Sequence, residues 1–167
     1  MNQVTAYIAF GSNLGDRQAL IQQALDALAR QAGVTLRRVS PVYETEAVGF
    51  AHSAPPFLNG VAEIHVECPP RELLALLLRI ESQLGRTRPR PSPGEPRPQS
   101  RPIDLDLLLY GDQILSDPDL QIPHPRLQAR WFVLKPLSDL CPRRMLPGLG
   151  VTVEEALRAL DTRPAVP

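Results

Sequence analysis

The chain has 167 residues, of which 43% are apolar, and this length and composition suit one compact domain with its own core. Its formal net charge is zero at pH 7, so it lacks the basic excess that is typical of nucleic-acid-binding proteins. No segment reaches the ~20 consecutive apolar residues that a membrane helix needs. The N-terminal residues are typical of a strand rather than a signal peptide. We therefore expect a monomeric, cytoplasmic protein that binds neither nucleic acid nor membranes.

The first half of the chain alternates strand patterns with two amphipathic helices. Period-2 alternation and turn residues predict strands over residues 4–10, 34–43 and 57–66. Apolar residues at helical spacing predict one helix after Asp16 and a second, stronger one after Pro70. The stretch between the second and third strands is rich in Pro, Gly, Ala and Ser, and we expect a loop there.

The second half begins with a proline-rich loop. Residues 89–102 contain six prolines, which excludes regular structure. A leucine-dense strand is predicted over 103–110, a short helix over 126–134, and a last helix over 152–160 that opens with a capping box. The order strand, helix, strand, strand, helix, strand predicts an α+β, ferredoxin-like split βαβ fold in a single domain over 1–167. In this fold a mostly antiparallel sheet carries helices on one face and leaves the other face for an active site.

Asp104 and Asp106 are the candidate metal ligands. Alternation along a strand places both on one face, and it places four apolar residues on the other: Ile103, Leu105, Leu107 and Leu109. Two close carboxylates amid leucines repel each other and lose solvation, and a bound cation removes that cost. Magnesium prefers one or two carboxylates together with substrate phosphates. The pair predicts a magnesium site for transfer of a phosphate-type group from ATP, the alternative being a solvent-facing pair at a strand edge.

Arginines stand at both ends of the proline-rich loop. Arg86 and Arg88 precede it and Arg101 follows it. Guanidinium groups bind phosphate oxygens through two parallel hydrogen bonds, so these residues suit a clamp on ATP. An ordinary solvated basic turn is the alternative for Arg86 and Arg88.

Three further residues are candidates for ligand contacts. Asn59 offers two donors and an acceptor, enough to recognise the edge of a flat heterocycle, and Phe57 stands close enough to stack on it. Alone, this pattern is also that of an ordinary turn. His124, between two prolines, suits a phosphate contact or simply fills a turn.

Taken together and in order, these segments resemble the 6-hydroxymethyl-7,8-dihydropterin pyrophosphokinase family. The resemblance runs through residues 6–15, 39–45, 57–59, 81–88, 101–106 and 123–132. It implies transfer of diphosphate from ATP to the pterin hydroxymethyl group in folate biosynthesis, with AMP released. It further implies two Mg²⁺ ions on Asp104 and Asp106, and catalytic roles for Arg86, Arg88 and Arg101. Another magnesium-dependent nucleotide transferase, or a non-catalytic pterin- or nucleotide-binding module, are the alternatives.

The resemblance also implies contacts with each substrate. Residues matching the pterin contacts of the family are Thr45, Val48, Phe57, Asn59 and Phe132. Residues matching its ATP contacts are Glu81, Arg86, Arg88, Arg101, Leu107, Ile114, Ser116, His124 and Arg130. The adenine contacts near Leu107 and residues 114–116 are expected to come largely from the backbone.

Overall fold

A computed structural model describes residues 2–47, 50, 53–86 and 100–161 of the chain. Its elements are, in order, β1 (Val4–Ser12), α1 (Arg17–Ala29), β2 (Val34–Val39), β3 (Tyr43–Thr45), β4 (Phe57–Val66), α2 (Pro70–Gln83), β5 (Asp104–Tyr110), β6 (Leu115–Ser116), β7 (Gln121–Ile122), a 3-10 turn (Leu127–Ala129), α3 (Trp131–Leu140) and α4 (Val153–Asp161). Val48, Arg88 and residues 89–99 of the predicted loop lie outside the described residues. Among the described helices, none is long and apolar enough to cross a membrane.

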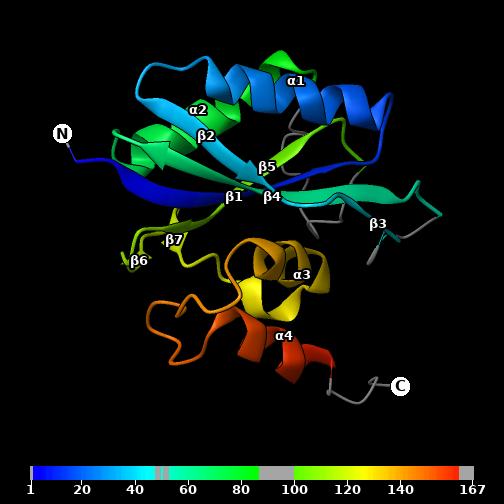
Figure 1. The fold of residues 1–167 in the computed structure, drawn as a ribbon. Coiled ribbons are helices and arrows are strands. Elements are labelled where there is room, and N and C mark those ends of the chain that lie inside the picture. The colour runs from blue at the N-terminus through cyan, green and yellow to red at the C-terminus, as the bar shows by residue number, and fades with distance from the viewer. Residues whose placement is uncertain (1, 48–49, 51–52, 87–99, 162–167) are drawn as a thin grey trace.

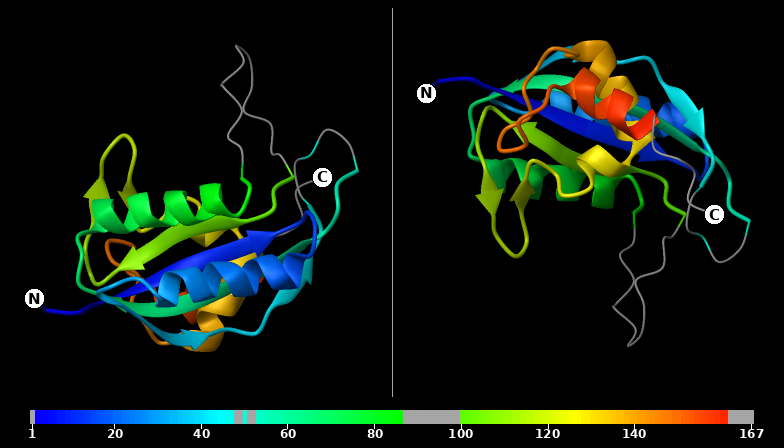
Figure 2. Two further views of the ribbon diagram at one scale, coloured as in Figure 1. Left: turned by 90° about the horizontal axis from the view of Figure 1, so that it is seen from above. Right: turned by 90° about the horizontal axis from the view of Figure 1, so that it is seen from below.

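The main sheet has the order β2-β4-β1-β5, with β3 adding to β4, and every pair in it is antiparallel. Helices α1 and α2 follow β1 and β4, the two strands at the centre, and lie across the sheet when it is seen from above (Figure 2). This is the split βαβ arrangement that the element order predicted. The α+β fold class is therefore confirmed.

Helices cover both faces of the sheet, with α1 and α2 on one and α3 and α4 on the other (Figure 1). Alternate residues of β1 show the division, because Ile8 and Phe10 belong to the core beneath α1 and α2, while Tyr7 and Ala9 belong to the core beneath α3 and α4. The second face is thus partly covered, rather than free as the sequence pattern indicated. The apolar residues of α3 and α4 need a surface to pack on, and this face supplies it.

The alternation of side chains along β5 shifts by one residue near the end of the strand. Its pairing with β1 shifts between Tyr7 and Ile8, which are opposite Leu109 and Leu107. Leu107 therefore packs beneath α1 and α2, whereas Leu109 joins the core beneath α3 and α4. The prediction that Leu109 shares a face with Leu107 was wrong, because a bulge adds a residue that strict alternation does not include.

The strand predicted over 34–43 is two strands, β2 and β3, that both pair with β4. The break falls at residues 40–42, where Pro41 has no N–H to give to a ladder. Ser40 takes over the pairing, because its hydroxyl accepts a hydrogen bond of 2.9 Å from the Val61 N–H. The short hairpin of β6 and β7 was not predicted, since two-residue strands carry no periodic signal.

The C-terminal helices also differ in extent from their prediction. Instead of one helix over 126–134, a 3-10 turn precedes α3, which continues to Leu140 with Pro136 inside it. Pro136 and Leu137 are buried, and this burial compensates for the one helical hydrogen bond that proline cannot make. The predicted capping box is confirmed, because the Glu155 N–H donates to Thr152 Oγ1 at 3.2 Å and the Thr152 N–H donates to Glu155 Oε2 at 2.8 Å.

Candidate active site

Two rows of residues run across the three strands β4, β1 and β5. In one row Gly11 of β1 lies between Asn59 and Asp104, and in the next Ala9 lies opposite Asp106. Neighbouring strands are about 4.8 Å apart, so the backbones of Asn59 and Asp104 are roughly 10 Å apart. The central strand contributes glycine and alanine here, and the surface between the amide and the carboxylates stays open.

A cavity of about 830 Å³ lies over these rows. It brings together most of the residues that the sequence singled out: Thr45, Phe57, Asn59, Arg86, Arg101, Asp104, Asp106, His124, Arg130 and Phe132. Segments from β3, β4, β5 and the start of α3 thus meet at one place. The residues predicted for the pterin and those predicted for the phosphates share a single cavity.

Four predicted ATP residues do not belong to the described lining of this cavity. Glu81 and Leu107 are buried, whereas Ile114 is 64% exposed and Ser116 lies in the β6–β7 hairpin. The expected adenine contacts near Leu107 and the hairpin involve the backbone, so they stay a prediction.

Asn59 is held in place from two sides. Its Nδ2 donates a hydrogen bond of 2.6 Å to Thr45 Oγ1 on the neighbouring strand β3. On the other side, a Cβ on Gly11 would stand only 2.8 Å from Asn59 Oδ1, so glycine is needed for this rotamer. Asn59, which is 7% exposed, therefore holds its carboxamide in one orientation at one end of the cavity.

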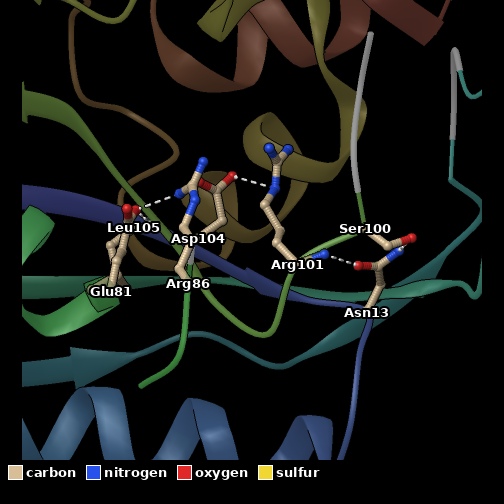
Figure 3. Close-up of polar contacts among 7 residues, drawn as sticks. All are labelled: Asn13, Glu81, Arg86, Ser100, Arg101, Asp104 and Leu105. Atoms are coloured by element: carbon tan, nitrogen blue, oxygen red, sulfur yellow. Dashed lines mark hydrogen bonds and ion pairs between the residues drawn. The ribbon is translucent and has the colours of Figure 1, made fainter. Parts of the chain in front are cut away.

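Arg86 connects Asp104 to a buried glutamate of α2 (Figure 3). Its Nη1 is 2.6 Å from Asp104 Oδ1 and 2.7 Å from Glu81 Oε1. Glu81 is 2% exposed, and its Oε1 also accepts a hydrogen bond of 2.8 Å from the Leu105 N–H. In this structure Glu81 acts from beneath the site, because it fixes both Arg86 and the stretch of β5 between the two aspartates.

The aspartate pair carries an electrostatic cost. Burial and the neighbouring charge of Asp104 raise the pKa of Asp106 to about 7, although Arg130 opposes the shift. Asp106 thus lacks full compensation of its charge from the protein, as expected at a cation site. The described residues contain no group of three or more His, Cys, Asp or Glu side chains suited to a metal. A two-carboxylate site fits Mg²⁺, which takes its other ligands from phosphates and water.

Two arginines line the cavity near the aspartates. Arg101 Nε is 3.5 Å from Asp104 Oδ2, and its guanidinium carbon is 5.8 Å from the centre of the Phe57 ring. Although buried, this Nε makes no hydrogen bond to any described residue. Arg130 lies over Phe132 at 5.6 Å, and burial lowers the pKa of its guanidinium. Together they supply positive charge at the end of the cavity that contains Asp104 and Asp106.

His124 is held in one orientation. Its Nδ1 accepts a hydrogen bond of 3.1 Å from the Arg126 N–H, and its main-chain N–H donates to Leu108 O. Burial, followed by the charges of Arg130 and Arg126, lowers the pKa of His124 to about 4. The ring is therefore neutral near pH 7, with its proton on Nε2 as a donor for an anionic oxygen.

The cavity contains residues that sequence reasoning missed, among them Gly11, Phe50 and Trp131. Phe50 lies 6.2 Å from Phe57, and Trp131 packs edge-on against Tyr43 at 5.7 Å. A lone phenylalanine in a loop rich in small residues was the one signal for Phe50. Gly11 fell just outside the strand predicted over residues 4–10, although it lies in the last part of β1.

Comparisons with known proteins give matches over most of the chain. Residues 7–142 match the family described as 7,8-dihydro-6-hydroxymethylpterin-pyrophosphokinase (HPPK). The 2-amino-4-hydroxy-6-hydroxymethyldihydropteridine pyrophosphokinase of Bacillus subtilis is 45% identical over 141 residues, which is 84% of this chain and 80% of that protein. The protein of the same name from Pseudomonas aeruginosa is 44% identical, over 84% of this chain and 83% of its own.

A solved structure of Plasmodium falciparum HPPK-DHPS has a similar fold, with a TM-score of 0.70 at 13% identity over 95% of this chain. The match takes up 45% of that chain, so this protein spans less than half of it. At such low identity the likeness shows the fold alone. The sequence match over residues 7–142 shows more: the chain belongs to the 7,8-dihydro-6-hydroxymethylpterin-pyrophosphokinase family.

Proposed function

We propose that this chain transfers diphosphate from ATP to the hydroxymethyl group of 6-hydroxymethyl-7,8-dihydropterin, as a step of folate biosynthesis. The products are AMP and the pterin diphosphate. Family membership and the names of the relatives support the reaction. The observation that supports it within this chain is the row Asn59–Gly11–Asp104, in which a fixed carboxamide and a carboxylate face one cavity.

The pterin is proposed to occupy the end of the cavity that contains Asn59. The fixed carboxamide can donate to and accept from the edge of a pterin ring. Phe57 and Phe132 line the same cavity and offer faces for stacking. Thr45 supports Asn59 through its hydroxyl.

The ATP phosphates are proposed to lie at the other end, near Asp104 and Asp106. These two carboxylates would hold two Mg²⁺ ions, which when bound neutralise phosphate charge and orient the reacting groups. Arg101 and Arg130 bind phosphate oxygens, and neutral His124 donates from Nε2. Arg86 already pairs with Asp104, so it stands within reach of any phosphate that this aspartate helps to hold.

The chemistry is an in-line displacement at the β-phosphorus of ATP. The pterin hydroxyl oxygen forms a bond to this phosphorus and gives up its proton to water. The bond between this phosphorus and the oxygen that bridges it to the α-phosphorus breaks, and that oxygen leaves as part of AMP. The protein contributes mainly alignment of the two substrates and stabilisation of charge, and these two effects provide most of the catalysis of phosphoryl transfer. The monomeric state, the cytoplasmic location and the number of ions stay predictions.

Product analysis tests this function directly. The protein is incubated with ATP, Mg²⁺ and the reduced hydroxymethylpterin, and nucleotides and pterins are separated by chromatography. We expect AMP and a pterin diphosphate in equal amounts. Release of pyrophosphate would indicate a nucleotidyl transferase, and binding without turnover would indicate a non-catalytic module; either result contradicts the proposal.

A further inference from the structure

Asn13, the residue that follows β1, bonds to two separate stretches of chain at the edge of the cavity, one at Pro55 and one at Ser100 and Arg101. Its Oδ1 accepts a hydrogen bond of 2.7 Å from the Arg101 N–H. Its Nδ2 donates to Ser100 Oγ at 3.0 Å and to Pro55 O at 3.1 Å. The main-chain N–H of Asn13 also donates to Arg101 O at 3.2 Å. Figure 3 shows the Asn13 carboxamide facing Ser100 and the backbone of Arg101.

These bonds use both amide hydrogens of a side chain that is 1% exposed. A carboxamide supplies one acceptor and two donors from a single planar group, which a hydroxyl or a carboxylate cannot do. A buried polar group with these partners is costly to remove and leaves little capacity for a ligand. Asn13 thus acts on the protein rather than on a substrate.

The segments that Asn13 joins lead to the two ends of the cavity. Asn13 bonds to both the N–H and the carbonyl oxygen of Arg101. The Arg101 side chain extends toward Asp104 and the Phe57 ring. Pro55 lies just before β4, the strand that begins with Phe57 and carries Asn59. One buried side chain therefore sets where the phosphate-facing arginine lies relative to the strand proposed to bind the pterin.

We infer that Asn13 is a positioning residue for diphosphate transfer, acting through Arg101. It holds the Arg101 backbone so that the guanidinium stays beside Asp104, while Nε makes no hydrogen bond to any described residue. The inference rests on the proposed function, because the arginine matters only where phosphate charge has to be bound. A misplacement of about 1 Å in such a group costs roughly 100-fold in rate.

A double-mutant cycle tests the inference. Asn13→Ala, Arg101→Ala and the double variant are compared with the wild type for kcat and for KM with each substrate. We expect Asn13→Ala to lower kcat about 10–100-fold while each KM changes less than about threefold. In the Arg101→Ala background the same change should cost less than about twofold, because its effect passes through the missing guanidinium.

Asp16→Ala is the matched control. Asp16 lies in the same turn and its Oδ1 accepts a hydrogen bond of 3.1 Å from the Ala19 N–H, so it caps α1. This variant should lower the melting temperature and leave kcat unchanged, whereas Asn13→Ala lowers both. If Asn13→Ala does not fold, Asn13→Asp enters the same cycle, since it keeps the acceptor for the Arg101 N–H and loses the two donors.

Each outcome decides the matter. A loss from the Asn13 change that is the same with and without Arg101, or a wild-type kcat in the Asn13 variant, overturns the positioning role alone. A wild-type protein that forms no AMP overturns the proposed function and this inference with it. Loss of kcat that disappears in the Arg101→Ala background supports both.

Discussion

The carboxylate of Glu81 accepts a hydrogen bond of 2.8 Å from the main-chain N–H of Leu105, the residue between Asp104 and Asp106. The same oxygen is 2.7 Å from Arg86 Nη1. A residue of α2 thereby fixes Arg86, which lines the cavity, and the stretch of β5 backbone between the two aspartates. Mutation of a residue that supports a metal ligand typically lowers metal affinity or activity by about 10- to 100-fold.

Glu81→Ala is expected to lower kcat by about 10–100-fold and to destabilise the fold by about 3–5 kcal/mol, because a mostly buried arginine loses a partner. Steady-state kinetics and urea unfolding measure the two effects. Glu81→Gln is the control, since it keeps an acceptor for the Leu105 N–H and should lose less of both. Wild-type kcat in a folded Glu81→Ala protein would show that this anchor is irrelevant to the site.

Replacement by alanine should have different effects at two glycines of the paired strands β1 and β4. A Cβ at Gly11 would stand 2.8 Å from Asn59 Oδ1, whereas one at Gly60 would stand 2.3 Å from the Phe10 ring. Gly11→Ala should therefore raise KM for the pterin about tenfold with little change in stability, since it displaces the recognition amide. Gly60→Ala should instead destabilise the protein by at least about 1–3 kcal/mol through overpacking.

Kinetics with the pterin varied and thermal unfolding of both variants check this contrast. In an Asn59→Ala background, Gly11→Ala should raise KM no further, because the group that it displaces is already gone. A Gly11→Ala protein with unchanged KM for the pterin would contradict the placement of Asn59 at the pterin.

Asp106 makes the metal-free protein less stable at alkaline than at acidic pH. Its pKa is raised by burial and by Asp104 to about 7 in the folded state, from an ordinary value of 3.8. A carboxyl group whose pKa is higher in the folded than in the unfolded state contributes its full stability below the unfolded-state pKa. This contribution is lost as pH rises through the folded-state pKa, which for Asp106 means between about pH 4 and pH 7. Without Mg²⁺, Asp106→Asn should therefore be more stable than the wild type at pH 8, by about 1–3 kcal/mol.

Urea unfolding in EDTA at pH 5 and pH 8 measures this difference, which should shrink at the lower pH. Other titrating groups contribute to both proteins and largely cancel in the comparison. An Asp106→Asn protein that is less stable than the wild type at pH 8 would show that the aspartate pair carries no electrostatic cost.

His124 should titrate far below an ordinary histidine. Burial and the nearby arginines lower its pKa to about 4 in the folded state. As pH falls, the unfolded chain therefore binds a proton at His124 near pH 6.5, whereas the folded chain binds it only near pH 4. Stability from this group is present above about pH 6.5 and is lost as pH falls toward 4. The histidine ring signals in an NMR titration should show one midpoint near 4, and it should vanish in His124→Asn. A His124 midpoint above 6 would contradict the buried, neutral ring.

Much of the site was predictable because strand periodicity and motif order carry it. Alternation was enough to place Asp104 and Asp106 on one face, since both precede the shift in pairing of β5. It failed for Leu109 because a bulge depends on the partner strand rather than on local pattern. The α3 and α4 layer was missed for a similar reason, because the face that a helix covers is decided by tertiary packing.

The residues that support the site were harder to predict than those that line it. Asn13 was not among the predicted site residues, and Glu81 was predicted as an ATP contact. Their partners lie far away in sequence, since Asn13 bonds to Arg101 and Glu81 to Leu105. Such contacts appear only once the strands are assembled. Gly11 belongs with them, since its role depends on the Asn59 side chain across the ladder.

The most direct measurement is AMP formation by Asp106→Ala beside the wild type, with ATP, Mg²⁺ and the reduced hydroxymethylpterin at saturation. Loss of a carboxylate that is proposed to hold Mg²⁺ should lower the rate by at least about 1000-fold. Circular dichroism and thermal unfolding should show the fold intact, because Asp106 lines the cavity and adds no packing to either core. Near-wild-type AMP formation by the folded variant would contradict the assignment of Asp104 and Asp106 as the centre of diphosphate transfer.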